Sequence, residues 1–217
     1  MYLLKTFAKA ILLKIGLYYS LNFFWNIFNI FRWIQFGCKL NAPHPIKMMI
    51  IKSYLDEFNI NTFVETGTFM GDTLGFIAET GCNCISIELS EEFYKNALKR
   101  FKSHGNVHLI YGDSGEQLPR FISDLKSPAI FWLDGHYSAG NTAIGDEHTP
   151  ISKEVKAVLA HPVKDHVILI DDARCFDGTN NYPYLDELLM FIRKDGNYFA
   201  EVSTDIIRLT PKNKINI

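Results

Sequence analysis

An acid and two glycines in the stretch Thr62–Asp72 give the first indication of chemistry. An apolar run ends at Glu65, and Gly67 and Gly71 follow in the spacing Glu-x-Gly-x-x-x-Gly. Gly67 allows a sharp turn and a close approach to a ligand, and Gly71 allows the start of a helix to pack near the strand. This spacing differs from the dinucleotide fingerprint, and the leading carboxylate would repel a phosphate. It favours a cationic or hydroxyl-rich ligand, and the alternative is an ordinary turn of another doubly wound domain.

Two further acids stand where later apolar runs end. Glu88 follows Ile85–Ile87 and lies 21 positions after Gly67, close to the separation of about 20 at which a carboxylate grips a ribose diol. Its alternative role is a negative charge ahead of the next helix. Asp113 can accept a hydrogen bond from an exocyclic amine such as that of adenine, or it can cap the following helix, a role open to Ser114 as well.

Three more carboxylates follow two entirely apolar runs. Asp134 follows Ile130–Leu133, and Asp171 and Asp172 follow Val167–Ile170. At the carboxyl edge of a parallel sheet these side chains meet in the binding crevice. Carboxylates so close repel one another unless they are protonated or bridged by a cation, and oxygen ligands suit Mg²⁺. The pattern predicts a divalent-cation site, with caps and salt bridges as the structural alternative.

The residues after the first of these runs offer a base and a lid. His136 is suited to take a proton from an acceptor hydroxyl, and the alternative is a structural, hydrogen-bonded histidine. The polar segment from Tyr137 to Thr149 predicts a lid over the acceptor. Thr149 and the next residue, Pro150, predict the start of a helix, with the threonine as N-cap and the proline in the first turn. Arg174 either holds an anionic part of the acceptor or pairs with a neighbouring acid.

Alternating strand and helix patterns position these residues. The predicted strands are Thr62–Gly67, Asn83–Leu89, Val107–Gly112, Ala129–Asp134, Val167–Asp171, Tyr198–Val202 and Ile206–Leu209. The predicted helices are Ile46–Phe58, Asp72–Glu79, Glu91–Lys102, Gly115–Leu125, Ile151–Leu159 and Tyr184–Arg193. Repeated strand-helix units indicate an α/β fold, a doubly wound and mostly parallel seven-stranded sheet, and the short link around Thr204 makes the last two strands an antiparallel hairpin.

In their order along the chain, five segments resemble the class I S-adenosylmethionine-dependent methyltransferases, in a bacterial branch related to the metal-dependent O-methyltransferases of the catechol and macrocin type. The segments read ETGTFMGDT, SIELSEEF, GDSGEQLP, FWLDGHYSAGNT and ILIDDARCF, and the resemblance covers about residues 62 to 209. It implies the Rossmann-like methyltransferase fold. Catechol-type enzymes have Asn where this chain has Asp172.

The resemblance also implies the roles of the site residues. S-adenosylmethionine is expected at Glu65, Thr66, Gly67, Thr68, Gly71, Asp72, Thr73, Glu88, Leu89, Asp113, Ser114 and Asp134. The expected metal ligands are Asp134, Asp171 and Asp172, so that Asp134 lies at the boundary of cofactor and metal. Together with His136 as base, these residues predict methylation of a hydroxyl on a sugar or a small natural product. The rival class is a non-catalytic protein that keeps the cofactor pocket or only the fold.

Charge is unevenly distributed along the 217 residues. Seven basic residues and no acid precede Asp56, which leaves 22 − 7 = 15 basic against 24 acidic residues in the remainder. An acidic catalytic part argues against a nucleic-acid groove, whereas the basic, apolar N-terminus suits an anionic surface. The four cysteines show no metal-binding spacing, and reduced thiols in a cytoplasmic protein are expected.

The N-terminal segment, residues 1–42, is predicted to be helical and separate from a methyltransferase-like domain at 43–217. It is aromatic and lacks the cleavage site of a signal peptide, while Asn22, Asn26 and Asn29 form one polar stripe. Three interpretations stay open: a membrane span, a helix lying in the membrane plane, and a cap on the domain or on a second subunit. Asn41–Pro45 is the predicted linker. The protein is expected in the cytoplasm, with peripheral contact at the inner membrane face and a possible homodimer through these helices.

Overall fold

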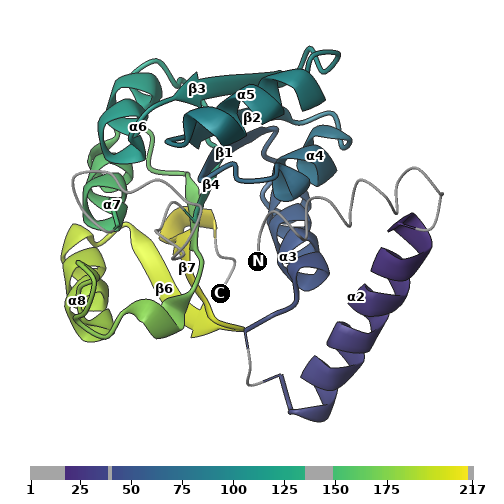
Figure 1. The fold of residues 1–217 in the computed structure, drawn as a ribbon. Coiled ribbons are helices and arrows are strands. Elements are labelled where there is room, and N and C mark those ends of the chain that lie inside the picture. Colours follow the sequence, from purple (N-terminus) through teal and green to yellow (C-terminus); the bar gives the residue numbers. More distant parts are fainter. Residues whose placement is uncertain (1–17, 39–40, 135–148, 215–217) are drawn as a thin grey trace. The chain divides into compact units, whose positions relative to one another are not determined.

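The structure, a computed structural model, describes residues 18–38, 41–134 and 149–214. The chain divides into two compact units, Met1–Lys47 and Met48–Ile217. The division falls inside helix α3 (His44–Glu57), just past the predicted linker. The second unit contains the sheet and every site residue predicted from the sequence (Figure 1).

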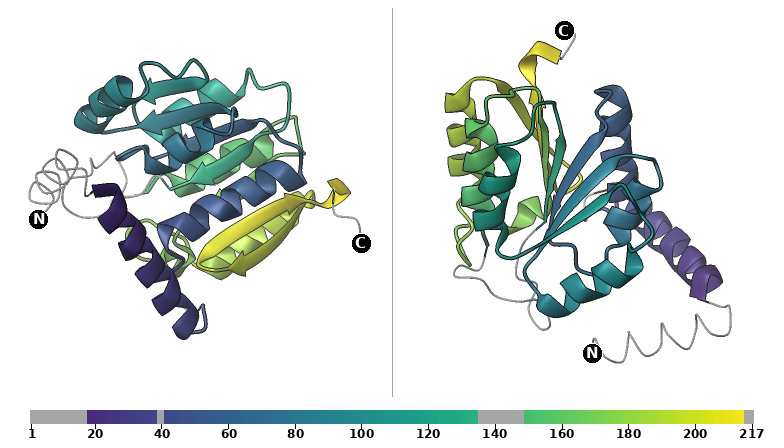
Figure 2. Two further views of the ribbon diagram at one scale, coloured as in Figure 1. Left: turned by 90° about the vertical axis from the view of Figure 1, so that its right-hand side faces the viewer. Right: turned by 90° about the horizontal axis from the view of Figure 1, so that it is seen from above.

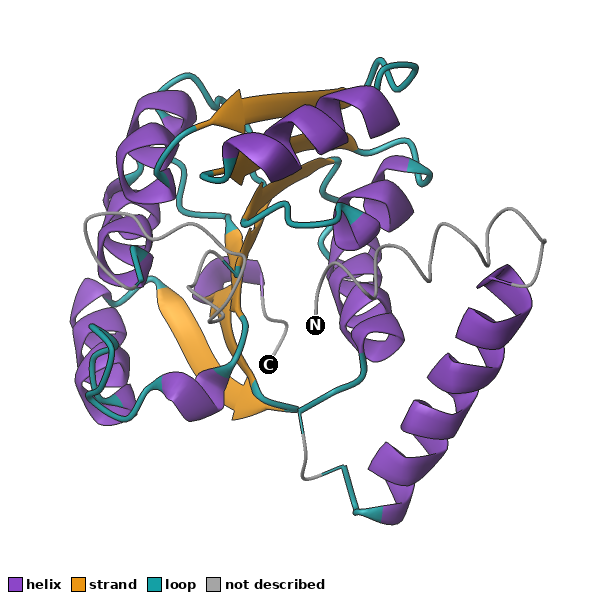
Figure 3. Ribbon diagram, viewed as in Figure 1, coloured by secondary structure: helices purple, strands orange, loops and turns teal. Residues whose placement is uncertain are grey.

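A seven-stranded sheet forms the centre of this second unit, as the sequence predicted. The strand order is β3-β2-β1-β4-β5-β7-β6, and Figure 3 shows the strands between two sets of helices. The strands are β1 (Thr62–Thr66), β2 (Asn83–Glu88), β3 (Val107–Tyr111), β4 (Ile130–Leu133), β5 (Val167–Ile170), β6 (Tyr198–Ser203) and β7 (Ile206–Pro211).

Strand pairing brings the predicted site residues to one edge. The first five strands pair in parallel, with Thr66 opposite Ile87 on one side and opposite Leu133 on the other. Leu133 is in turn opposite Ile170 of β5. Strand β7 runs antiparallel to β5 and forms the predicted hairpin with β6. The carboxyl ends of β1, β2, β4 and β5 therefore lie side by side.

Successive side chains of the central strands point to opposite faces of the sheet and pack into two separate cores. In β4, Ile130 and Trp132 belong to the core under α3, α4 and α5, whereas Phe131 and Leu133 belong to the core under α6, α7 and α8. The view from above in Figure 2 shows these two sets of helices on opposite sides of the sheet. Buried strands of this kind are apolar on both faces, which explains the uninterrupted hydrophobic runs in the sequence.

The helices lie where the sequence placed them, with small shifts at their ends. They are α4 (Asp72–Ala78), α5 (Glu91–Arg100), α6 (Ser114–Ile122), α7 (Ile151–Ala160) and α8 (Leu185–Asp195). The linker prediction was wrong at its end, because α3 begins at His44 and includes Pro45. A proline is tolerated in the first helical turn, where its missing N–H needs no partner. The start predicted for α7 was wrong by one residue, because Pro150 rather than Thr149 holds the N-cap position. Thr149 Oγ1 still accepts the Ile151 N–H, at 3.3 Å.

Of the described residues, the first unit contains helix α2 (Tyr18–Gln35) and the first turn of α3. The α2 side chains Phe24, Trp25 and Phe31 are 66%, 60% and 58% exposed. Within the described part of the chain, none of the helices has the length and hydropathy required to cross a bilayer. All four cysteines are free thiols in the structure.

Candidate active site

Three carboxylates converge where β4 and β5 end. One oxygen from each of Asp134, Asp171 and Asp172 lies within 4.8 Å of the others, and both Asp171 and Asp172 are buried. The register of β4 and β5 causes this convergence, since the last residues of the two strands are direct neighbours. Three hard oxygen donors on one side of a site are a set that fits Mg²⁺ or a similar divalent ion.

Local contacts hold these carboxylates in place. The carboxylate of Asp171 accepts the Asp172 N–H at 2.8 Å, and Asp172 has a φ of 56°, in the left-handed region. Arg174 Nη1 donates to Asp172 Oδ1 at 2.8 Å and also pairs with Asp205. Of the two interpretations of Arg174, the structure therefore supports pairing with neighbouring acids. Its single positive charge offsets only part of the charge of the cluster.

Glu65 lies beneath the same edge and is only 2% exposed. Ser86 Oγ of β2 donates to Glu65 Oε2 at 2.7 Å, and the Ser86 and Thr68 hydroxyls are 2.6 Å apart. Burial raises the pKa of Glu65 to about 8, and the nearby carboxylates of Asp134 and Glu88 also raise it. A buried acid with a raised pKa favours a cationic ligand, because the positive charge stabilises the ionised carboxylate.

The turn after Glu65 has the backbone conformation that its glycines predict. Gly67 has a φ of 83°, and its N–H donates to Ile87 O at 2.9 Å. Gly71 has a φ of 72°, and a Cβ at this position would come within 2.8 Å of the Phe101 ring at the end of α5. Gly71 thus permits close packing of α4 against α5, whereas the sequence suggested packing against the strand. Asp72 in the first turn of α4 forms an ion pair with Arg100 at 2.6 Å, next to Thr73.

Glu88 ends β2 in a well-defined position. Its two oxygens accept the Phe69 N–H at 2.7 Å and the Ser90 N–H at 2.8 Å. Leu89 lies between the end of β2 and Ser90, the N-cap of α5. Burial raises the pKa of Glu88, while these backbone donors lower it. Each carboxylate oxygen can accept a second hydrogen bond, so the bonds to the backbone orient Glu88 without preventing it from binding a diol.

Asp113 caps helix α6, and its side chain accepts the Gly115 N–H at 2.8 Å. The capping alternative is therefore confirmed for Asp113, and Ser114 is the first residue of the helix. A contact of Asp113 with adenine stays a prediction.

Comparison with known proteins gives matches among solved structures only, since no family model and no curated protein matches the sequence. The O-methyltransferase TomG of Streptomyces achromogenes, solved with S-adenosylmethionine, superposes with a TM-score of 0.58 at 15% identity over 79% of this chain and 81% of that one. A putative caffeoyl-CoA O-methyltransferase from Staphylococcus aureus gives 0.57 at 13% identity over 83% and 91%. The 23S rRNA methyltransferase ErmE gives 0.51 at 13% identity over 80% and 70%.

The chain has the class I methyltransferase fold. Within this fold, small-molecule and ribosomal RNA methyltransferases are both structural neighbours of the chain. The fold therefore leaves the acceptor open, and the site residues must provide any evidence about it.

Residues 135–148 lie outside the part of the methyltransferase fold that the structure describes. The predicted base His136 and nearly all of the predicted lid fall in this segment. The role of His136 accordingly stays a prediction.

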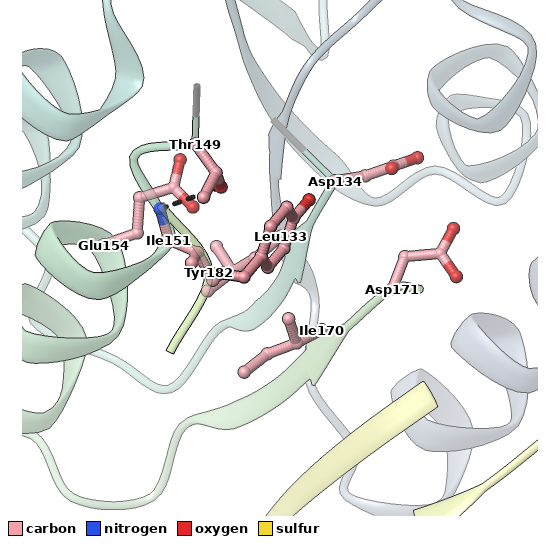
Figure 4. A pocket seen from close by; sticks show the side chains of 8 residues that line it. All are labelled: Leu133, Asp134, Thr149, Ile151, Glu154, Ile170, Asp171 and Tyr182. Carbon is pink, nitrogen blue, oxygen red and sulfur yellow. Dashed lines mark hydrogen bonds between the residues drawn. The ribbon is translucent and has the colours of Figure 1, made fainter. Parts of the chain in front are cut away.

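A small pocket beside the carboxylate cluster contains an acid that the sequence did not single out. It measures about 10 Å³ and is lined by Leu133, Asp134, Thr149, Ile151, Glu154, Ile170, Asp171 and Tyr182, as Figure 4 shows. Glu154, in the first turn of α7, is fully buried, and burial raises its pKa to about 7. Its spacing relative to Ile151, Val155 and Val158 places it on the apolar face of the helix, and this spacing was the available sequence signal.

Proposed function

We propose that this protein is an S-adenosylmethionine-dependent methyltransferase that methylates a hydroxyl group on a sugar or small natural product. The observation that carries the proposal is the edge formed by Glu65, Glu88 and Asp134 beside the left-handed Gly67 turn. An acidic edge with close backbone approach fits a ligand that has a sulfonium, an ammonium and a ribose. When bound, S-adenosylmethionine supplies an electrophilic methyl group on a positively charged sulfur.

The chain's own residues hold and orient the reactants in this proposal. Glu88, fixed by two backbone donors, accepts the hydroxyls of the ribose, and Glu65 faces the cationic methionine portion. The Gly67 turn lets the backbone lie against the cofactor because no side chain intervenes. Orienting the acceptor in line with the methyl group supplies a large share of the rate enhancement in such transfers.

The carboxylates of Asp134, Asp171 and Asp172 would hold a divalent cation in the proposed enzyme. Such a cation would supply Lewis acidity towards an acceptor hydroxyl. The donor set fits this role, as three oxygens lie within 4.8 Å of one another.

Titration calorimetry with S-adenosylmethionine tests the cofactor, and transfer of a labelled methyl group to a panel of hydroxyl compounds tests the reaction. Binding with turnover on a member of the panel is expected. Absence of binding would refute the proposal. Binding without transfer to any acceptor of the panel would favour the rival, a non-catalytic cofactor-binding protein.

We also propose that the N-terminal unit attaches the enzyme peripherally to an anionic membrane face. The support is the exposed aromatic surface of α2, here defined by Phe23, Phe24, Trp25, Phe28 and Phe31, in a unit with six basic residues and no acid. Aromatic and basic side chains together suit the headgroup region of an anionic bilayer. Homodimerisation through the same surface is the alternative.

A further inference from the structure

Glu154 is a charged residue type at a core position of α7. It is 0% exposed and shares its helix face with Ile151, Val155 and Val158, all of which are buried. Neither carboxylate oxygen has a hydrogen-bond partner among the described residues. Buried carboxyl groups are normally paired, and a leucine or methionine would fill this position without the cost of removing an acid from water. The acid therefore calls for an explanation beyond packing.

The surroundings of Glu154 come from the ends of three strands rather than from its own helix. The hydroxyls of Thr66 and Ser114 are close enough to lower its pKa, although neither meets the geometry of a hydrogen bond. The carboxylates of Asp113 and Asp134 raise its pKa. All four neighbours belong to the edge at which the methyl donor is proposed to bind.

Thr66 connects this buried acid to the metal and cofactor boundary. Its Oγ1 accepts the Asp134 N–H at 3.3 Å, so the hydroxyl oxygen is bound on the side of β4. A hydroxyl that accepts on one side directs its own hydrogen elsewhere. Glu154 lies next to it on the α7 side, in the core formed by α6, α7 and α8.

Among the described residues, the pocket leaves little room for any other partner of Glu154. Glu154 faces a space of about 10 Å³ that it shares with Asp134 and Asp171. Such a space holds about one water molecule at most, and no organic group. The hydroxyls of Thr66 and Ser114 are thus the donors best placed to satisfy the carboxylate.

We propose that Glu154 is a positioning residue of the methyl-donor site, which accepts the Thr66 and Ser114 hydroxyls and thereby fixes the β1 turn and the start of α6 against Asp134. The inference rests on the proposed function, because the edge that it orders is the one assigned to S-adenosylmethionine. Its effect is on affinity for the donor, and it needs no contact of Glu154 with the donor itself.

The test separates affinity from stability in four variants of the full-length protein. Glu154→Met keeps the volume and removes the acceptor, so S-adenosylmethionine should bind about tenfold more weakly, the loss expected for about one charged hydrogen bond. The thermal unfolding midpoint should stay equal or rise, since a desolvated carboxyl is removed. Glu154→Gln retains an acceptor oxygen and should recover most of the affinity. Val158→Ala on the same helix face, the matched control, should lower the unfolding midpoint and leave the dissociation constant unchanged.

Ser114→Ala supplies the fourth variant and a second line of evidence that does not depend on the methionine variant alone. If Glu154 acts through Ser114, then Ser114→Ala weakens binding in the wild type and has no further effect in a Glu154→Met background. Wild-type affinity in Glu154→Met, or fully additive effects of the two substitutions, would overturn the inference. A wild-type protein that binds no S-adenosylmethionine would instead overturn the proposed function, and the inference with it.

Discussion

Glu65 and Thr66 are adjacent in β1, and the alternation of the strand sends their side chains to opposite faces of the sheet. Glu65 reaches Ser86 on the side of α3, α4 and α5, whereas Thr66 reaches the side of α7, where Glu154 lies. Two buried carboxylates thus approach one edge from two separate cores. Each has a raised pKa, about 8 for Glu65 and about 7 for Glu154, because burial penalises the charged form.

Replacing Gly67 with valine should abolish binding of S-adenosylmethionine. The position has a φ of 83°, which a β-branched residue adopts only with strain, and the new side chain would occupy the space that the cofactor needs. Calorimetry on the folded variant measures the loss.

Gly81→Val is the matched control for this substitution. Gly81 also has a φ of 83°, and a Cβ there meets nothing within 4 Å. Strain on the order of 1–3 kcal/mol should appear in both variants, and only the Gly67 variant should lose binding. Equal affinity in the two variants would place the cofactor elsewhere.

Replacing Asp171 with alanine should remove methyl transfer while the sheet stays folded, because one ligand of the cation is lost. Treatment of the wild type with EDTA should have the same effect, and added Mg²⁺ should reverse it. The exposed Asp186→Ala on α8 is the control and should keep full activity. Full turnover in excess EDTA, with no metal found by elemental analysis, would exclude the metal-assisted route. Asp171→Ala would then cost only about 1 kcal/mol of stability, as for a lost hydrogen bond.

Most of the acids predicted at the site were predictable because they lie within two residues of the carboxyl end of a strand. Asp134 and Asp171 are the clearest cases, since the register that joins them follows from a parallel sheet. Glu154 was missed because its importance depends on contacts with Thr66 and Ser114, which are distant in sequence. Spacing along one helix shows that an acid is buried and does not show what it faces.

A buried pair of histidines ties helices α6 and α7 to the amino ends of β4 and β5. His161 Nε2 donates to Ile122 O at 2.8 Å, which leaves His161 Nδ1 to accept from His166 Nε2 at 2.9 Å. His166 Nδ1 then accepts the Ala129 N–H at 3.0 Å. Since a carbonyl only accepts and a backbone N–H only donates, this chain of bonds requires both rings to be neutral.

This arrangement predicts a loss of stability in acid. Burial, together with His161, lowers the pKa of His166 from 6.5 to about 4. Between pH 6.5 and 4, His166 is therefore protonated in the unfolded chain and neutral in the folded chain. Its contribution to the free energy of unfolding is lost as the pH falls from 6.5 towards 4. The raised pKa values of Glu65 and Glu154 have the opposite effect, since they increase the free energy of unfolding as the pH falls from about 8 to 4.5. Only a comparison of variants therefore isolates the effect of His166.

The comparison uses denaturant unfolding of the wild type and His166→Gln at pH 7.5 and pH 5.0. The destabilisation caused by the substitution should be smaller at pH 5.0 by about 2 kcal/mol. His108→Gln on the exposed side of β3 is the control and should show no such difference. A pH-independent effect of His166→Gln would contradict the assignment of neutral rings.

The fold was predictable at the level of elements because the period of the hydrophobic pattern changes clearly between strand and helix. All seven strands and the C-terminal hairpin occur where they were expected. The ends were less predictable. Helix α3 includes Pro45 and α7 begins after Pro150, since capping contacts such as that of Thr149 decide where a helix starts.

At the scale of the whole molecule, the exposed aromatic surface of α2 predicts binding to anionic vesicles. Full-length protein should float with vesicles that contain phosphatidylserine and bind neutral vesicles more weakly, because the basic residues add an electrostatic attraction. A protein that begins at Asn41, which retains all of α3, should stay in the soluble fraction.

Substitution of Phe24, Trp25 and Phe28 by serine in the full-length chain is the finer test, since it keeps every basic residue. Reduced flotation of this variant would show that the aromatic surface inserts. Equal recovery of full-length and truncated protein in the soluble fraction would refute membrane attachment, and light scattering would then decide whether the segment forms a dimer.

The strand order also determines when the site can form during synthesis. Strands β1, β2 and β3 are neighbours both in sequence and in the sheet, so this half can pair as soon as it leaves the ribosome. The cluster of three carboxylates forms only when β5, the fifth strand to be made, lies next to β4. A nascent chain stalled before Val167 would therefore already present Glu65 and Glu88 to a donor while lacking Asp171 and Asp172. Cofactor affinity should be acquired earlier in translation than the ability to activate an acceptor.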